Sequence, residues 1–136
     1  MHNDIFSALS GNKLPELDKG MGTLVEDLAQ RGLLDSTMVV WMGEFGRTPR
    51  INQNGGRDHW PRSWSVVMGG GGLKGGQLIG ATDKDGVEVI DREVGVMDVV
   101  ACMAKGMGID LATEYTTPRG RPIKVVDDGT PIPELF

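Results

Sequence analysis

The amino-acid sequence predicts an α/β fold in which a mostly parallel sheet is flanked by helices. Three observations support this expectation. Helical patterns cover residues 15–30 and 96–107, and two short apolar runs, 37–42 and 63–68, have the character of strands. Helices and strands that alternate along a chain are typical of a sheet with helices on its faces. A length of 136 residues predicts one domain, 1–136, that is large enough to bury a core.

The first predicted helix runs from Pro15 to Gln30. Acidic residues occupy its first turn, Gly32 follows its end, and its apolar residues recur at helical spacing. Those apolar residues are Leu17, Met21, Leu24, Val25 and Leu28. The spacing predicts a single apolar face, and we expect that face to pack on the sheet.

Two apolar runs predict the central strands. The run Thr37–Met42, TMVVWM, shows no alternation of polar and apolar residues, which is typical of a strand covered on both faces. We therefore expect an interior, parallel strand there. The run Ser63–Met68, SWSVVM, has the same character, and we expect the two strands to lie side by side in one sheet.

The second half of the chain contains three further predicted elements. The segment GQLIGATDKDGVEVI indicates a hairpin with Asp85 and Gly86 at its turn. A second helix is predicted from Val96 to Met107, because apolar residues line one face and Gly108 follows its end. A short strand is predicted over Ile123–Val126, between proline-rich turns.

Composition excludes several classes of protein. The formal net charge of −5 argues against a nucleic-acid binder, and no apolar run is long enough to predict a membrane span. The single cysteine, Cys102, excludes an intrachain disulfide and a thiolate metal cluster. The N-terminal residues MHNDIFSALSGNK contain no secretory signal, so the chain itself leaves the cellular location unknown.

A charged, glycine-rich segment follows the first predicted strand. Glu44 comes just after the strand, and Asp58 and His59 lie near the end of the segment. Sites in open α/β sheets form at the carboxyl ends of strands, where a carboxylate and an imidazole suit a divalent cation such as zinc. The alternative is structural: Glu44 pairs with Arg47 or Arg50, and the His59 ring packs on Trp60. The sequence alone leaves both interpretations open.

Three segments of the chain together resemble a large group of bacterial proteins, abundant in planctomycetes, described as domain-of-unknown-function or sulfatase-like proteins. The segments are LLDSTMVVWMGEFGRTPRINQNGGRDHWP, GGGGLKGGQLIGATDKDG and GRPIKVVDDGTPIPELF. That group resembles the alkaline phosphatase superfamily. The resemblance implies that the chain is similar to the C-terminal part of a longer catalytic domain, with a partial alkaline-phosphatase-like sandwich as its fold. It also implies relatives that are exported.

The resemblance implies metal ligands at separate positions. Glu44 matches an acidic ligand of one metal, although Phe45 stands where the superfamily usually has a histidine. His59 in GGRDHW matches a ligand of the other metal, and His2 in MHND resembles the histidine of an Asp-x-His element. The metal expected in the intact family is zinc, calcium or manganese. Arg47 is expected to contact an anionic ester substrate, and a salt bridge to Glu44 or Asp58 is the alternative.

The resemblance therefore implies the C-terminal part of a metal-dependent phosphate- or sulfate-ester hydrolase. The family's nucleophile has no counterpart in the chain, so we expect this chain to be inactive on its own and to begin at an internal methionine. The alternative is a non-catalytic α/β module or truncated gene product with weak metal or anion binding. Self-association is also expected, because an interior strand that lacks its neighbours exposes an apolar edge.

Overall fold

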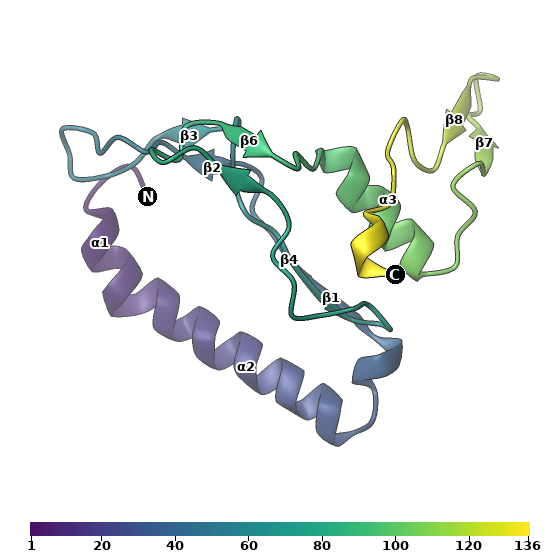
Figure 1. Ribbon diagram of the computed structural model, residues 1–136, viewed down its shortest axis with the longest axis horizontal. Helices are drawn as coiled ribbons and strands as arrows, with labels where there is room; N and C mark the ends of the chain where they lie inside the picture. The colour runs from purple at the N-terminus through teal and green to yellow at the C-terminus, as the bar shows by residue number, and fades with distance from the viewer.

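The computed structural model describes residues 1–136, in which short helices and two-stranded sheets form an open frame (Figure 1). The N-terminal half contains α1 (Ile5–Ala8), the π-helical turn η1 (Leu9–Lys13), α2 (Leu14–Gln30), the 3-10 turn η2 (Leu34–Ser36), β1 (Met38–Trp41), β2 (Gly46–Arg47), β3 (His59–Trp60) and β4 (Val67–Gly70). The C-terminal half contains β5 (Ala81–Thr82), β6 (Val89–Asp91), α3 (Val96–Gly106), β7 (Glu114–Thr116), β8 (Pro122–Lys124) and the 3-10 turn η3 (Pro133–Leu135).

The predicted parallel sheet is wrong. Every strand has a single partner and pairs with it antiparallel, in the order β1–β4, β2–β3, β5–β6 and β7–β8. The fold is a mixture of helices and small antiparallel sheets, so the expectation of an alkaline-phosphatase-like, mostly parallel sandwich is also wrong. The apolar run carries no information on the direction of the neighbouring strand. The burial expected on both faces is absent too, since no residue of β1 is buried and Trp41 is exposed.

The two central strands do lie side by side, as predicted. In the antiparallel β1–β4 ribbon, Met38 is opposite Gly70 and Trp41 is opposite Val67. The second strand begins at Val67 and not at Ser63, because the residues after Trp60 form a turn and an irregular segment before pairing resumes. Both outer edges of this ribbon are unpaired, since the sheet has only two strands.

The first helix is confirmed, whereas its packing on a sheet is not. α2 covers Leu14–Gln30, one residue longer at its start than predicted, and none of its residues is buried. Its principal neighbours are η1 before it and η2 after it, and Figure 1 shows it as a long arm that leads through η2 into β1. The amphipathic pattern predicted the helix correctly, but within this chain nothing covers its apolar face completely. No helix of the chain is long and apolar enough to span a membrane.

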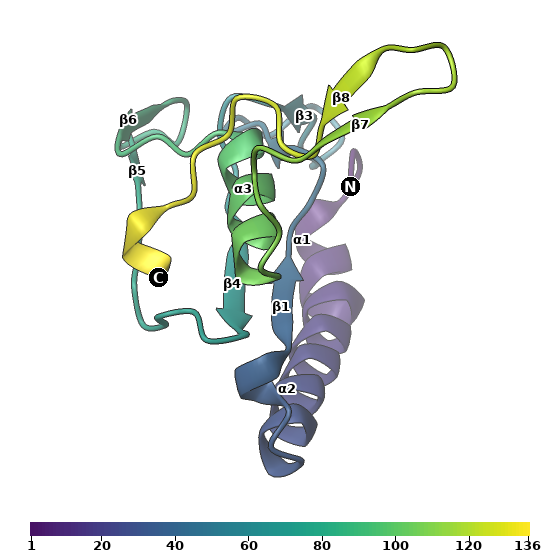
Figure 2. The ribbon, with the colours of Figure 1, turned by 90° about the vertical axis from the view of Figure 1, so that its right-hand side faces the viewer.

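The buried residues gather around the second helix. α3 begins after Gly95 and ends near the predicted position, with Gly108 in a left-handed conformation just beyond it. One cluster joins its buried alanines to the C-terminal segment through Val126, and a second joins Cys102 to Ile132 and Leu135. Figure 2 shows the C-terminal segment running beside α3, while the β7–β8 hairpin projects away. The core is small, with 10 of 136 residues buried.

The side chain of Asp98 fixes the start of α3 and ties the C-terminal segment to it. Its two carboxylate oxygens accept the N–H groups of Gly95 and Thr130, each at 2.8 Å. These hydrogen bonds, the one from Thr130 first, hold the pKa of Asp98 below its usual range because they favour the ionised form.

The predicted hairpin is confirmed, and the last strand is displaced. β5 and β6 pair across a turn in which Gly86 has a positive φ of 69° and Asp83 accepts the N–H of Val87 at 2.7 Å. The last strand covers Pro122–Lys124 rather than Ile123–Val126, because Val126 turns into the cluster under α3.

Candidate functional site

The N-terminal segment is bound to the loop between β2 and β3, which brings together residues more than fifty positions apart. A β-bridge joins Asn3 to Gly55. Further backbone hydrogen bonds run from the Asp4 N–H to the Asn54 carbonyl (2.9 Å), from the Ile5 N–H to the Gly55 carbonyl (3.0 Å) and from the Arg57 N–H to the Met1 carbonyl (3.1 Å). Ile5 is buried at the end of this segment. These contacts place His2 against the loop.

The close approach of the two segments requires a glycine at position 56. A Cβ atom on Gly56 would lie 2.0 Å from the carbonyl oxygen of His2 and 2.6 Å from the backbone nitrogen of Asn3. Cβ atoms do not approach backbone atoms so closely, so any larger residue would push the N-terminal segment away.

His2, Asp58 and Asn52 form a hydrogen-bonded group at this junction. The Nδ1 atom of His2 lies 2.9 Å from Oδ1 of Asp58, and Nδ2 of Asn52 donates to the same oxygen at 3.1 Å. Asn52 also donates to the backbone carbonyl of His2 at 3.0 Å. The hydrogen bond with His2, followed by the one with Asn52, lowers the pKa of Asp58 from its usual value. An ionised Asp58 accepts the Nδ1–H of His2, and Nε2 of a neutral His2 then holds a lone pair.

His59 lies beside this group, at the start of β3. Its ring centroid is 4.9 Å from that of His2 and 4.0 Å from that of Phe45. Pairing of β2 with β3 sets His59 opposite Arg47, whose guanidinium carbon lies 5.4 Å from the centre of the Phe45 ring. Trp60 points to other partners and donates its indole N–H to the Val87 carbonyl at 2.9 Å. The His59 ring therefore packs on Phe45 and His2, not on Trp60.

Arg47 and Glu44 do not form the salt bridge considered from the sequence. The four ion pairs of the chain involve His2 with Asp58, Arg31 with Asp27, Arg62 with Glu88 and Arg92 with Glu134. Nη1 of Arg47 is buried and has no hydrogen-bond partner, which leaves a cationic donor unsatisfied. Glu44 is exposed between β1 and β2 and forms no ion pair or side-chain hydrogen bond.

The residue types at this junction are ones that zinc sites use, but too few of them converge to form such a site. Two imidazoles with free ring nitrogens suit zinc, and a carboxylate on the other nitrogen of a histidine is the usual arrangement that orients such a ligand. A catalytic zinc takes about three protein ligands. The chain holds no group of three or more His, Cys, Asp or Glu side chains placed to bind a metal ion, so Glu44 does not join His2 and His59 in one set.

Reasoning from the sequence missed the roles of Asn52 and Asp58. Oδ1 of Asn52 accepts the N–H groups of Asn54 and Gly56, at 3.0 and 2.9 Å, and this Asx-type turn shapes the loop. The sequence NQNGG contains that turn signal. What it lacks is any sign that the loop closes on the N-terminal segment, because that contact spans fifty residues.

Comparison with known proteins identifies the family of the chain. No curated protein and no solved structure is significantly similar to the chain. The model of one protein family, described as "Protein of unknown function (DUF1501)", matches residues 1–136. This match confirms that the resemblance noted in the sequence was to a family of uncharacterised proteins, and it covers every element that builds the junction of His2, Asp58 and His59. The chain belongs to the DUF1501 family.

Proposed function

We propose that this chain supplies part of the active site of a metal-dependent phosphate- or sulfate-ester hydrolase, related to the sulfatase-like proteins of the alkaline phosphatase superfamily. The observation that carries the proposal is the pair formed by His2 and His59. Their rings lie 4.9 Å apart, and Asp58 bonds to one of them. Histidine is a usual zinc ligand, and the fold brings these two together from positions 2 and 59.

In this proposal the two imidazoles are the metal ligands. Imidazole ligands favour zinc over manganese and calcium, which prefer oxygen ligands. Asp58 orients the His2 ring through its hydrogen bond with Nδ1, which leaves Nε2 as the ring nitrogen that would bind the metal. A bound metal would polarise the ester and activate the attacking group. Glu44 lies apart from the histidines and would serve a second metal position, as the resemblance implies.

Arg47 is the proposed contact for the anionic part of the ester. Its Nη1 has no partner in the protein, and its guanidinium lies near the Phe45 ring, which in turn packs on His59. A guanidinium provides paired N–H donors that match phosphate and sulfate oxygens. The guanidinium thus lies close to the proposed ligands and holds one unpaired donor, which is buried.

We expect the chain alone to bind metal weakly and to show no turnover. A catalytic zinc requires about three protein ligands, and this pair supplies two imidazoles. The remaining ligands and the nucleophile would come from residues other than His2 and His59. The unpartnered Nη1 of Arg47 favours a second candidate, a non-catalytic module with weak anion or metal binding.

Calorimetry on the 136-residue chain tests the proposal. Zinc, manganese and calcium are titrated into the wild type and into His2→Ala, His59→Ala and, as the control, Glu93→Ala, which removes an exposed acid outside this junction. We expect weak zinc binding that disappears in either histidine variant and persists in the control. Zinc binding that is unchanged in both histidine variants would contradict the proposed ligands.

Ester assays complete the test. Aryl phosphate and aryl sulfate are offered to the chain with each metal, and we expect no turnover. Tight stoichiometric metal binding, together with hydrolysis lost in Glu44→Ala and His59→Ala, would show that the chain assembles a complete site and would overturn the expected inactivity. Sulfate binding that is lost in Arg47→Ala, without any metal binding, would favour the anion-binding module.

A further inference from the structure

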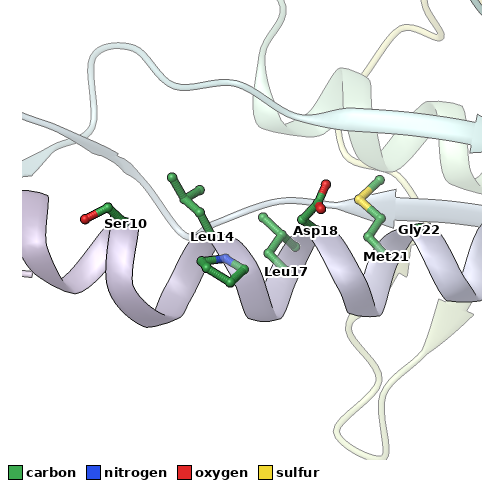
Figure 3. Close-up of a pocket in the computed structure, with 7 residues that line it drawn as sticks. Ser10, Leu14, Leu17, Asp18, Met21 and Gly22 are labelled. Atoms are coloured by element: carbon green, nitrogen blue, oxygen red, sulfur yellow. The ribbon is translucent and has the colours of Figure 1, made fainter.

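The helix α2 carries a row of apolar residues with the spacing of a coiled coil. Five apolar residues follow one another at alternating intervals of three and four positions: Leu14, Leu17, Met21, Leu24 and Leu28. This is the a/d pattern of a heptad repeat, in which a second helix packs along the row. Figure 3 shows the side chains of Leu14, Leu17 and Met21 on the same side of the helix. We call these five residues the α2 seam.

Within the chain, the α2 seam is only partly covered: Leu17, Met21 and Leu28 are half-buried, and Leu14 and Leu24 are exposed. No residue of α2 is buried, and the side chains of Leu14 and Leu24 are 52% and 48% exposed. A shallow hollow of about 700 Å³ lies along the seam, and all the residues that line it belong to the helical run from Ser10 to Gly22. A hollow bounded by a single helix has an open side, where another element can pack.

The total surface of the chain is larger than that of a compact monomer. The accessible surface of the chain is 9601 Å². A compact monomer of this mass, 14.6 kDa, exposes about 6,900 Å². The excess is therefore about 2,700 Å² per chain. If two copies each covered half of that excess, they would bury about 2,700 Å² in total, which lies in the range of permanent homodimers.

We propose that two copies of this chain associate through the α2 seam, with their α2 helices parallel and in register. A single apolar row serves both partners of such a pair, as a twofold interface requires. The flanking charges favour the parallel arrangement. Lys13, the last residue of η1, and Asp18 in α2 occupy g and e positions of this pattern, so Lys13 would lie next to Asp18 of the second copy and attract it. This inference is independent of the proposed metal site, which lies on other elements.

Sedimentation equilibrium of the 136-residue chain tests the dimer, from about 1 to 200 μM. Met21→Lys places a charge in the seam, and Thr23→Lys places the same charge on the other side of the helix as the matched control. We expect a wild-type dimer whose dissociation constant rises about 30-fold or more in Met21→Lys and by less than about 2-fold in Thr23→Lys. Far-UV circular dichroism of both variants checks that the helix remains, and added EDTA leaves the dimer unchanged.

A cross-linking experiment tests the orientation. Cys102 is fully buried, so Leu24→Cys introduces the single accessible thiol. In a parallel, in-register pair the two introduced thiols meet, and mild oxidation is expected to link Leu24→Cys chains much faster than Thr23→Cys chains. Equal rates for the two variants would contradict the parallel pair.

Three other results would overturn the inference. The first is a wild-type chain that remains monomeric at the highest concentration. The second is dissociation caused by Val67→Lys on β4 but not by Met21→Lys, which would place the contact at the sheet edge. The third is a monomer that binds vesicles of neutral phospholipid through the seam, with Met21→Lys abolishing that binding.

Discussion

Replacement of Gly56 by alanine is expected to detach the N-terminal segment and to separate His2 from His59. The added Cβ would lie 2.0 Å from the His2 carbonyl oxygen, and ordinary contacts require about 3.2 Å or more, so one segment must move by about 1.2 Å. Both neighbours at this point are backbone atoms. The clash therefore cannot be relieved by a change of side-chain rotamer.

The expected loss of unfolding free energy follows from the contacts that the N-terminal segment makes. Ile5 is 2% exposed, and burial of such a side chain stabilises by about 1.5–3 kcal/mol. The three backbone hydrogen bonds of residues 4, 5 and 57 add about 0.5–1.5 kcal/mol each. The chain entropy regained by about four released residues, about 1–2 kcal/mol each, offsets most of this sum. We expect the free energy of unfolding to fall by about 1–3 kcal/mol.

Hydrogen exchange measured residue by residue is the assay. The amides of Asp4 and Ile5 are expected to lose their protection in Gly56→Ala, while amides in α3 keep theirs apart from the global loss of stability. Gly11→Ala is the matched control, because a Cβ there meets nothing within 4 Å and its φ is not positive. Protection of Asp4 and Ile5 that is as strong in Gly56→Ala as in the wild type would refute the reasoning.

The remaining predictions concern Asp98 and pH. Asp98→Ala removes two charge-assisted hydrogen bonds, and we expect it to lower the free energy of unfolding, measured by urea denaturation, by about 2–3 kcal/mol. Glu93 is an exposed acid just before α3 and serves as the control. Glu93→Ala is expected to change the free energy of unfolding by less than about 0.5 kcal/mol. Because the pKa of Asp98 is lowered on folding, its contribution is complete above the unfolded pKa near 3.8 and is lost as pH falls through the folded pKa. Asp98→Ala should therefore destabilise the chain at pH 6 and much less at pH 2, and an equal effect at both values would contradict the role of the ionised carboxylate.

Local signals predicted the helices and the hairpin, because those elements depend on neighbouring residues. The apolar spacing over Pro15–Gln30 and the Asp85–Gly86 turn are examples, and the structure contains both. The direction of β4 relative to β1 depends on the path of the twenty-five residues between them, which no local pattern describes. The structure also does not confirm the prediction that α2 packs on the sheet. An apolar face indicates that some element covers it, but it does not indicate which one.

For the candidate site, the sequence identified ligand types but not their arrangement. His59 and Glu44 stand out in a charged loop, yet the structure places His59 with His2 and leaves Glu44 apart. The roles of Asp58 and Asn52 follow from a closure between residues 1–5 and 52–58 that has no signature in either segment. The need for glycine at position 56 could not be predicted from the sequence either, because it arises from contact with the carbonyl of the distant residue His2.

The most direct test of the account is a zinc titration of the 136-residue chain followed by nitrogen NMR of the two imidazoles. We predict that His2 and His59 respond together, with one shared binding curve. We also predict that the Nδ1–H tautomer of His2 is present before metal is added, because Asp58 accepts that proton. Asp58→Asn should weaken zinc binding about 10-fold or more. Zinc that shifts only one of the two imidazoles, or neither of them, would contradict the claim that His2 and His59 form one ligand pair.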